Sequence, residues 1–196
     1  MQNTNTRETI DIWHGSLTTS IRHFWPLTHF GSIEQAKVAI IAKAALDHEL
    51  GELVLYELKL SFESDSVFRI EDGGSPFYQA IFLHYCEALG IKDKEFNLRH
   101  REANNMGLSA DDPEWLRWLT DLAELNGHGV LSYDNEVEGQ GTSYSIVNMR
   151  SICLVSSTIL SWEELQRCFK SIPHSDLGYS ASDIKKMSDF LIDKIS

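Results

Sequence analysis

The sequence predicts an α+β fold, with strands at the start and in the middle of the chain and helices between and after them. Residues 53–62 alternate apolar and polar side chains, as a strand with one buried face does. Residues 129–133 and 143–148 are two strand-like runs joined by an acidic, glycine-rich turn, which is typical of a hairpin. Elsewhere, helix-capping residues precede apolar residues at helical spacing.

Each element has a local signal of its own. Ser32 and Gln35 form the pattern of a capping box, as do Ser161 and Glu164. The predicted strands cover residues 9–13, 53–62, 129–133, 143–148 and 152–156. Helices are predicted from Ser32 to about Leu50, from Ser75-Pro76 to Leu89, from Asp112 to Gly127, from Ser161 to about Lys170 and from Ile184 to Ile195. Gly51 is the expected stop of the first helix, and a turn at Gly73-Gly74 precedes the second. A short helical turn is expected over residues 20–24.

Residues 91–111 are polar and show no clear periodicity, so we expect them to form a mobile or target-facing loop. The compact basic cluster Arg99, His100 and Arg101 lies within this stretch. It is a candidate contact for RNA or DNA, and its plainer interpretation is a solvated loop.

Size and composition limit the class of protein. The 196 residues suit a single domain, with a core over about residues 9–156 and a C-terminal helical extension over 157–196. A hydrophobic fraction of 42% is enough for a sizeable core. The 17 Lys and Arg against 29 Asp and Glu give a net charge of −12, which argues against binding duplex nucleic acid through its phosphates. The negative net charge suits a chain that binds a small anionic ligand through local dipoles or docks a basic partner.

The three cysteines, Cys86, Cys153 and Cys168, are odd in number and far apart. Because no CxxC pair occurs, neither a disulfide framework nor a structural metal site is expected. The N-terminus lacks the apolar run of a signal peptide, and no stretch of about 18 apolar residues occurs. We therefore expect a cytoplasmic protein without a membrane segment.

Three short motifs carry a candidate function. The first is Ile12-Trp13-His14-Gly15-Ser16, at the end of a strand. The second is Thr28-His29-Phe30-Gly31-Ser32, ahead of a helix. The third is the hairpin over residues 127–148. In this order and spacing, over about residues 10–155, they resemble the NAD-binding core of ADP-ribosyltransferases, in particular small domains of bacterial and phage polyvalent proteins.

The resemblance implies a split antiparallel β-sheet core and NAD as the substrate. ADP-ribose would pass to a macromolecular acceptor, with release of nicotinamide. It also implies that His14 binds the adenosine ribose, that the Gly15 backbone receives the nicotinamide amide, and that Phe30 or Tyr144 stacks on nicotinamide. The positions that it assigns to NAD are His14, Gly15, Ser16, Thr28, His29, Phe30, Ser143 and Tyr144. Without the resemblance, His14 reads as a partly buried histidine, and Phe30 and Tyr144 read as core aromatics.

The catalytic acid departs from the family pattern. Ser143 stands where the relatives similar to poly-ADP-ribose polymerases have a glutamate, and His128 stands where the hairpin usually has an aspartate. The acids present are Glu136 and Glu138, earlier in the turn, and the candidate catalytic residues are Glu138, Glu136 and His14. Either the turn brings one of them into the site, or the chain lacks the usual acid.

Three functions follow from this resemblance. The first is an ADP-ribosyltransferase of the toxin or effector type, whose acceptor is a protein or, as the alternative, RNA or DNA. A cognate antitoxin or immunity protein, and delivery into a target cell, are further implications. The second is an NAD glycohydrolase, which uses the same site without an acceptor. The third is a degenerate relative that binds NAD or a partner protein without turnover.

Overall fold

Two β-sheets form the centre of the computed structural model, which describes residues 6–19, 21, 23–71, 77–135 and 137–196. One sheet is antiparallel in the order β1-β3-β7, and the other has the order β2-β6-β5-β4 with only the β4–β5 pair parallel. A single bridge between Trp13 and Gly31 joins them. The strands are β1 (Arg7–Ser16), β2 (His29–Phe30), β3 (Val54–Glu63), β4 (Val67–Arg69), β5 (Val130–Asp134), β6 (Thr142–Ile146) and β7 (Ile152–Ile159).

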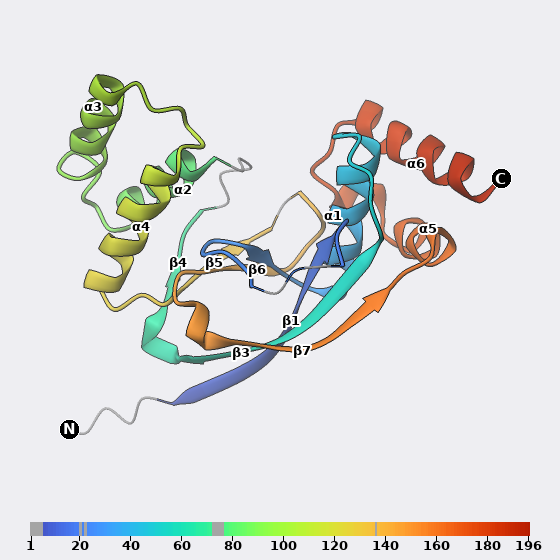
Figure 1. Ribbon diagram of the computed structural model, residues 1–196, viewed down its shortest axis with the longest axis horizontal. Helices are drawn as coiled ribbons and strands as arrows, with labels where there is room; N and C mark the ends of the chain where they lie inside the picture. Colours follow the sequence, from blue (N-terminus) through green and yellow to red (C-terminus); the bar gives the residue numbers. More distant parts are fainter. Residues whose placement is uncertain (1–5, 20, 22, 72–76, 136) are drawn as a thin grey trace.

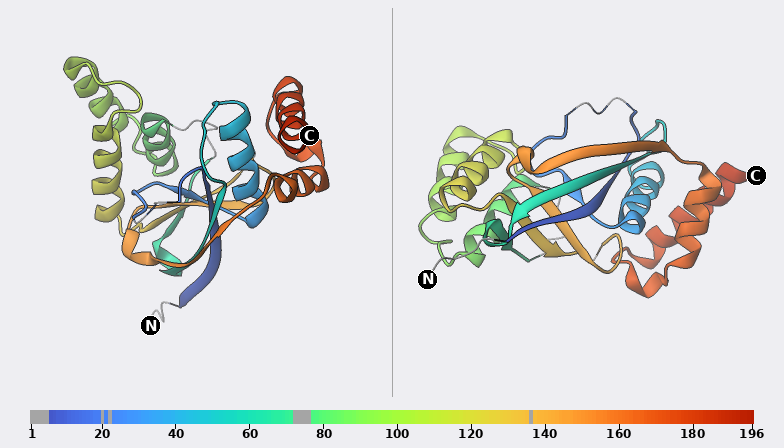
Figure 2. Two further views of the ribbon diagram at one scale, coloured as in Figure 1. Left: turned by 45° about the vertical axis from the view of Figure 1, so that its right-hand side comes forward. Right: turned by 90° about the horizontal axis from the view of Figure 1, so that it is seen from below.

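The helices lie in two groups at opposite ends of the sheets (Figures 1 and 2). One group is made of α1 (Ile33–Ala45), α5 (Trp162–Ser171) and α6 (Ala181–Ile195). The other is made of α2 (Tyr78–Ala88), α3 (Phe96–Met106) and α4 (Pro113–Leu125). The chain is thus a mixed α+β fold, as the sequence predicted.

The alternating pattern of β3 explains how one strand serves two apolar cores. Tyr56, Leu58 and Leu60 face the core between the two sheets, whereas Leu53 and Leu55 belong to the core under α1, α5 and α6. This division follows from the two-residue period of a strand. Because α5 and α6 share their core with α1, the predicted C-terminal extension is packed onto the rest of the chain.

Most local predictions are confirmed. Capping boxes start α1 at Ser32 and α5 at Ser161, and Asp112 caps α4. The hairpin of β5 and β6 pairs Val130 with Ile146 in antiparallel register. The short strands β2 and β4 were not predicted as such, because two or three residues are too few to show a period.

The prediction that α1 runs to Leu50 is wrong. The helix ends at Ala45, and His48 has a left-handed backbone with φ of 58°. Gly51 has another purpose, since a Cβ there would lie 1.8 Å from the Leu17 carbonyl oxygen. The glycine allows a close backbone crossing and does not stop the helix.

The prediction of a mobile loop over residues 91–111 is also wrong, because this segment contains α3. Phe96 and Ala103 pack into the core with α2 and α4, and Gly107 ends the helix in a left-handed conformation. The basic cluster lies on this helix, and its Arg99 already contacts other side chains. Arg99 pairs with Glu102 at 2.7 Å and lies over the Trp118 ring.

Parts of two further predictions lie outside the described residues. Of the helical turn predicted over 20–24, Ser20 and Arg22 are not described, and Ile21, His23 and Phe24 are not helical. Residues 72–76, with the predicted Gly-Gly turn and the Ser-Pro helix start, are likewise not described, and α2 begins at Tyr78. Within the described part of the chain, no helix has the length and apolar character needed to span a bilayer.

Candidate functional site

A cavity of about 470 Å³ lies where the two sheets separate, beside α1. Its walls come from five parts of the chain that are distant in sequence: the end of β1, the start of β2, one face of α1, the β5–β6 hairpin and the segment before α6. The lining residues are Trp13, His14, Gly15, Thr28, His29, Phe30, Gly31, Gln35, Ala36, Ala39, Ala42, Lys43, Asp47, Tyr133, Asn135, Val137, Glu138, Ser143 and Tyr179.

The backbone of Gly15 forms part of this cavity. Trp13 exchanges two backbone hydrogen bonds with Gly31 of the other sheet, at 2.9 and 3.0 Å. Backbone groups two residues apart on a strand point to the same edge, so the N–H and C=O of Gly15 point to the side where the sheets separate. The Gly15 carbonyl accepts a hydrogen bond from Lys43 Nζ at 3.4 Å. The N–H and C=O of Gly15 therefore lie at the edge of β1 that is not paired with β3, beside the cavity, and the carbonyl is bonded to Lys43.

Glycine is required at position 15 by packing as well. A Cβ there would lie 2.0 Å from the Ala36 carbonyl oxygen. The absence of a side chain lets α1 lie directly against β1. The sequence interpretation, which assigned this glycine to ligand approach alone, missed the helix contact.

His14 is a half-buried histidine whose ring is neutral near pH 7. Its ring lies among the rings of Phe24 and Phe30, with centroids 5.4 and 5.7 Å away. Its Nδ1 is 2.9 Å from the His29 carbonyl oxygen. Because a carbonyl only accepts, Nδ1 carries the hydrogen and Nε2 is left as an acceptor. Burial is the main cause that lowers the pKa of His14 to about 4, and the positive charge of Lys43 adds to it.

His29 extends the polar lining along β2. Its Nδ1 forms a hydrogen bond with the hydroxyl of Tyr133 on β5, and the two rings meet edge to face. Ser145 of β6 is 3.5 Å from the same nitrogen. These contacts fix the position of the His29 ring at the cavity wall.

Glu138 is the acid that the β5–β6 turn brings to the cavity, and Asn135 holds it there. The Asn135 Nδ2 donates to Glu138 Oε2 at 2.7 Å and to Ser143 Oγ at 3.0 Å. The Asn135 Oδ1 accepts from the backbone N–H groups of Val137 and Glu138, both at 2.9 Å. This is an Asx turn, in which a side chain takes the place of a backbone acceptor.

Gln35 fastens the same turn to the start of α1. Its Oε1 accepts from the Ser32 N–H at 2.7 Å, which completes the capping box. Its Nε2 donates to the Gly139 carbonyl at 3.1 Å and lies 3.5 Å from that of Gly141. Both glycines have positive φ, 126° and 136°, which lets the turn fold back over the helix.

The structure brings together most of the predicted site residues. His14, Gly15, Thr28, His29, Phe30, Glu138 and Ser143 all line the cavity. Ser16 and Tyr144 do not: Ser16 Oγ is 3.3 Å from the Thr18 N–H, and Tyr144 packs into the core between the sheets. Glu136 lies outside the described residues.

Several lining residues were missed. Lys43, Asp47 and the small residues Ala36 and Ala39 lie on one face of α1 and its end, at helical spacing that could have indicated them. Tyr179 had no signal as a site residue. Asn135 could have been recognised from the Asx-turn pattern ahead of two glycines.

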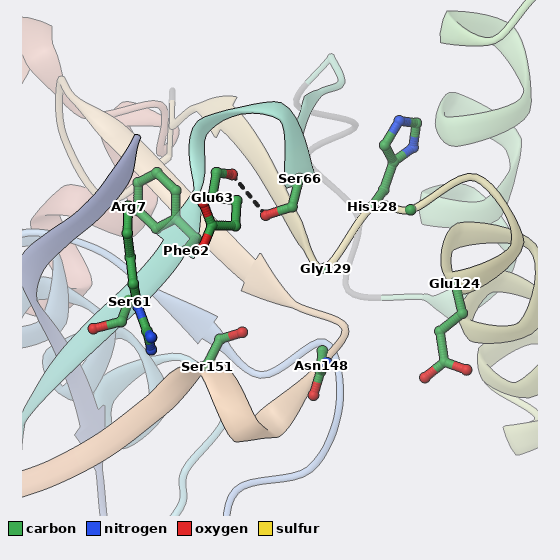
Figure 3. Close-up of a pocket in the computed structure, with 11 residues that line it drawn as sticks. Arg7, Ser61, Phe62, Glu63, Ser66, Glu124, His128, Gly129, Asn148 and Ser151 are labelled. Atoms are coloured by element: carbon green, nitrogen blue, oxygen red, sulfur yellow. Dashed lines mark hydrogen bonds between the residues drawn. The ribbon is translucent and has the colours of Figure 1, made fainter. Parts of the chain in front are cut away.

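A second cavity of about 430 Å³ lies at the other end of the sheets (Figure 3). Its lining includes Arg7, Glu63, Glu124, His128 and Asn148, from opposite walls. Figure 3 shows the His128 ring pointing away from Asn148. That ring stacks on Phe68 and is 2.8 Å from the Tyr85 hydroxyl. The side chains do not converge, so the first cavity is the candidate site.

No metal site accompanies the cavity: among the described residues, no group of three His, Cys, Asp or Glu side chains is arranged to hold a metal ion. Comparison with known protein families, with curated proteins and with solved structures found no match. The case for function therefore depends on the geometry of the cavity and on the resemblance of its motifs.

Proposed function

We propose that this chain is an ADP-ribosyltransferase that transfers ADP-ribose from NAD to a macromolecular acceptor and releases nicotinamide. One observation carries the proposal: the backbone edge of Gly15, the neutral His14 and the held carboxylate of Glu138 line the same cavity. Two antiparallel-rich sheets that separate beside this cavity support the split-sheet core that the resemblance implies.

The Gly15 edge suits a primary carboxamide. Such a group carries one acceptor and one donor side by side, which matches the N–H and C=O of one residue at a strand edge. Nicotinamide bound there would displace the Lys43 ammonium from the Gly15 carbonyl. The freed ammonium is then available for an anionic part of the ligand.

The length of the cavity and the ammonium group of Lys43 suit the rest of NAD. Its lining follows α1 from Gln35 to Lys43, which is about 12 Å at the usual rise per residue, and continues to Asp47. A dinucleotide needs an elongated site of this kind. Lys43 would contact the pyrophosphate, which needs a local cation in a chain with a net charge of −12.

The chemistry requires few groups. The bond between the ribose C1′ and the nicotinamide nitrogen breaks, and its electron pair leaves with nicotinamide. A positively charged, oxocarbenium-like sugar forms and is attacked by the acceptor nucleophile, which gives up its proton. Glu138 would stabilise the developing positive charge, and Asn135 fixes one oxygen of its carboxylate.

His14 has a binding role in this scheme. As a neutral ring with Nδ1 bonded to a carbonyl, it offers Nε2 as an acceptor for a ribose hydroxyl. Because its pKa is about 4, it stays neutral near pH 7 and cannot act as a general acid there.

The test is incubation of the purified chain, with labelled NAD and a cell lysate, beside the His14→Ala and Glu138→Gln variants. Nicotinamide release, and label in the protein and nucleic-acid fractions, are measured separately. We expect label on a macromolecule with the wild type and a loss of label with both variants. Nicotinamide release without transfer indicates hydrolysis instead. Binding of NAD without nicotinamide release contradicts both reactions.

A further inference from the structure

The segment immediately before α6 forms part of the candidate site. Leu177 is buried in the core shared by α1, α5 and α6. The next residue, Gly178, donates its N–H to the Val137 carbonyl in the β5–β6 turn, at 3.1 Å. Tyr179 then lines the cavity. Three consecutive residues thus connect the C-terminal helices to the turn that carries Glu138.

The position of Tyr179 is fixed by the start of α6. Ser180 is the N-cap and accepts from the Asp183 N–H. Tyr179 precedes the cap, and Ile184 is the fourth residue of the helix, which are the two positions of a hydrophobic staple. Both side chains belong to the same apolar cluster. The entry of the chain into α6 therefore places the Tyr179 ring at the cavity wall.

The turn is held on both sides of Glu138. Val137, which precedes it, is bonded through its carbonyl to Gly178. Gly139, which follows it, is bonded through its carbonyl to Gln35. The C-terminal segment and α1 therefore hold the residues immediately before and after the acid.

Tyr179 lines the cavity together with the acidic residues Glu138 and Asp47. Burial is the main cause that raises the pKa of Tyr179, and the negative charges of Glu138 and Asp47 raise it further. The phenol therefore keeps its proton and can donate a hydrogen bond to a carboxylate of the same cavity.

We propose that Tyr179 is a positioning residue for Glu138: its ring forms the wall behind the carboxylate, and its hydroxyl orients that carboxylate toward the ligand. This inference rests on the proposed function and extends it, since it makes the C-terminal segment a part of the catalytic arrangement. A residue of this kind affects the transition state more than the binding of NAD.

The first experiment measures nicotinamide release by the wild type, Tyr179→Phe and Phe190→Leu. Phe190 packs against Trp162 in the C-terminal helices and does not line the cavity, so it controls for loosening of these helices. We expect Tyr179→Phe to lower kcat about tenfold with KM changed less than about twofold, since one hydrogen bond to a charged group is lost. Phe190→Leu should leave both constants unchanged. A wild-type kcat in Tyr179→Phe overturns the proposal.

The second experiment does not depend on activity. Tyr179→Phe, Glu138→Gln and the double variant are unfolded with urea, and their midpoints are compared. Because the two side chains contact one another in the proposal, the double variant should shift the midpoint by less than the sum of the single shifts. Additive shifts overturn the proposal. If the wild type releases no nicotinamide, the proposed function fails, and this cycle still decides whether Tyr179 orients Glu138.

Discussion

The two cavities described above are of similar size, and each has a histidine and a glutamate in its lining. In the first, His14 is bonded to a backbone carbonyl, and Glu138 is held by Asn135 within a turn fastened on both sides. In the second, His128 faces Tyr85 and Phe68 and points away from Asn148 (Figure 3). The comparison teaches that residue types alone do not make a site. A site needs side chains that polar contacts hold toward a common space.

The largest expected effect is on the rate of nicotinamide release, which substitution of Glu138 should lower and substitution of Glu124 should not. Glu138→Gln should lower the rate of nicotinamide release about 100- to 1,000-fold, the range seen when one preorganised electrostatic contact is removed from an active site. Glu124→Gln, in the second cavity, is the matched control and should leave the rate unchanged. Steady-state kinetics checks both, with circular dichroism to show that the fold is intact. An equal effect of the two substitutions removes the distinction between the cavities.

The next largest effect is on stability, which alanine substitution should lower more at Gly15 than at Gly129. Gly15→Ala places a Cβ 2.0 Å from the Ala36 carbonyl oxygen, so α1 must move away from β1. We expect a loss of at least about 1–3 kcal/mol in the free energy of unfolding, measured with urea. At Gly129, in the second cavity, the nearest atom to an added Cβ is 3.7 Å away. Gly129→Ala should change stability by less than about 0.5 kcal/mol. Equal losses at the two positions contradict the close packing of α1 on β1.

A smaller effect is expected where the Glu138 turn meets α1. Gln35→Ala leaves the Gly139 carbonyl and the Ser32 N–H without their bonds to a buried side chain. It should cost about 1–3 kcal/mol of stability and also lower kcat, because the acid is held less firmly. Gln166→Ala removes a half-buried glutamine that accepts an exposed hydrogen bond from Lys170, and it serves as the control. A stability loss with an unchanged kcat would show that the turn needs no anchor on α1.

The smallest effect concerns the two histidines and pH. The pKa of His14 is about 4 in the folded chain and 6.5 when it is exposed. Between these values the unfolded chain binds the proton and the folded chain does not, so stability is fully present above about pH 6.5 and falls as the pH falls. The expected loss is about 2 kcal/mol by about pH 5, from urea unfolding at a series of pH values.

His14→Asn should flatten this pH dependence. Burial also lowers the pKa of His128, by less, so His128→Asn should change the slope in the same direction and by a smaller amount. A slope that is the same in His14→Asn as in the wild type contradicts a half-buried neutral imidazole at this position.

Local signals were sufficient for most of the fold. Helix caps such as Ser32 and Asp112 satisfy backbone groups within three residues, so their pattern is legible in the sequence. The helix α3 was missed because its surface is polar and only a few of its residues, among them Phe96 and Ala103, pack into the core. Its stability comes from packing against α2 and α4, which no local pattern records.

Strand alternation explains which site residues were misplaced. Ser143 lines the cavity and Ser145 contacts His29, so Tyr144 between them points to the opposite face of β6. This could have been predicted from the two-residue period. The family motif instead assigned Tyr144 a stacking role on nicotinamide. The position of Tyr144 on the face of β6 away from the cavity does not support that role.

The sequence by itself determined the class of fold, the helix caps, the hairpin and three candidate motifs, because these depend on neighbours within one turn or one strand. Only the tertiary structure decided that Glu138 lies in a cavity with His14 and Gly15, and that Lys43 and Tyr179 line it too. The physical reason is that these contacts join residues far apart in the chain. Their geometry depends on how sheets and helices pack, and packing is set by the whole core.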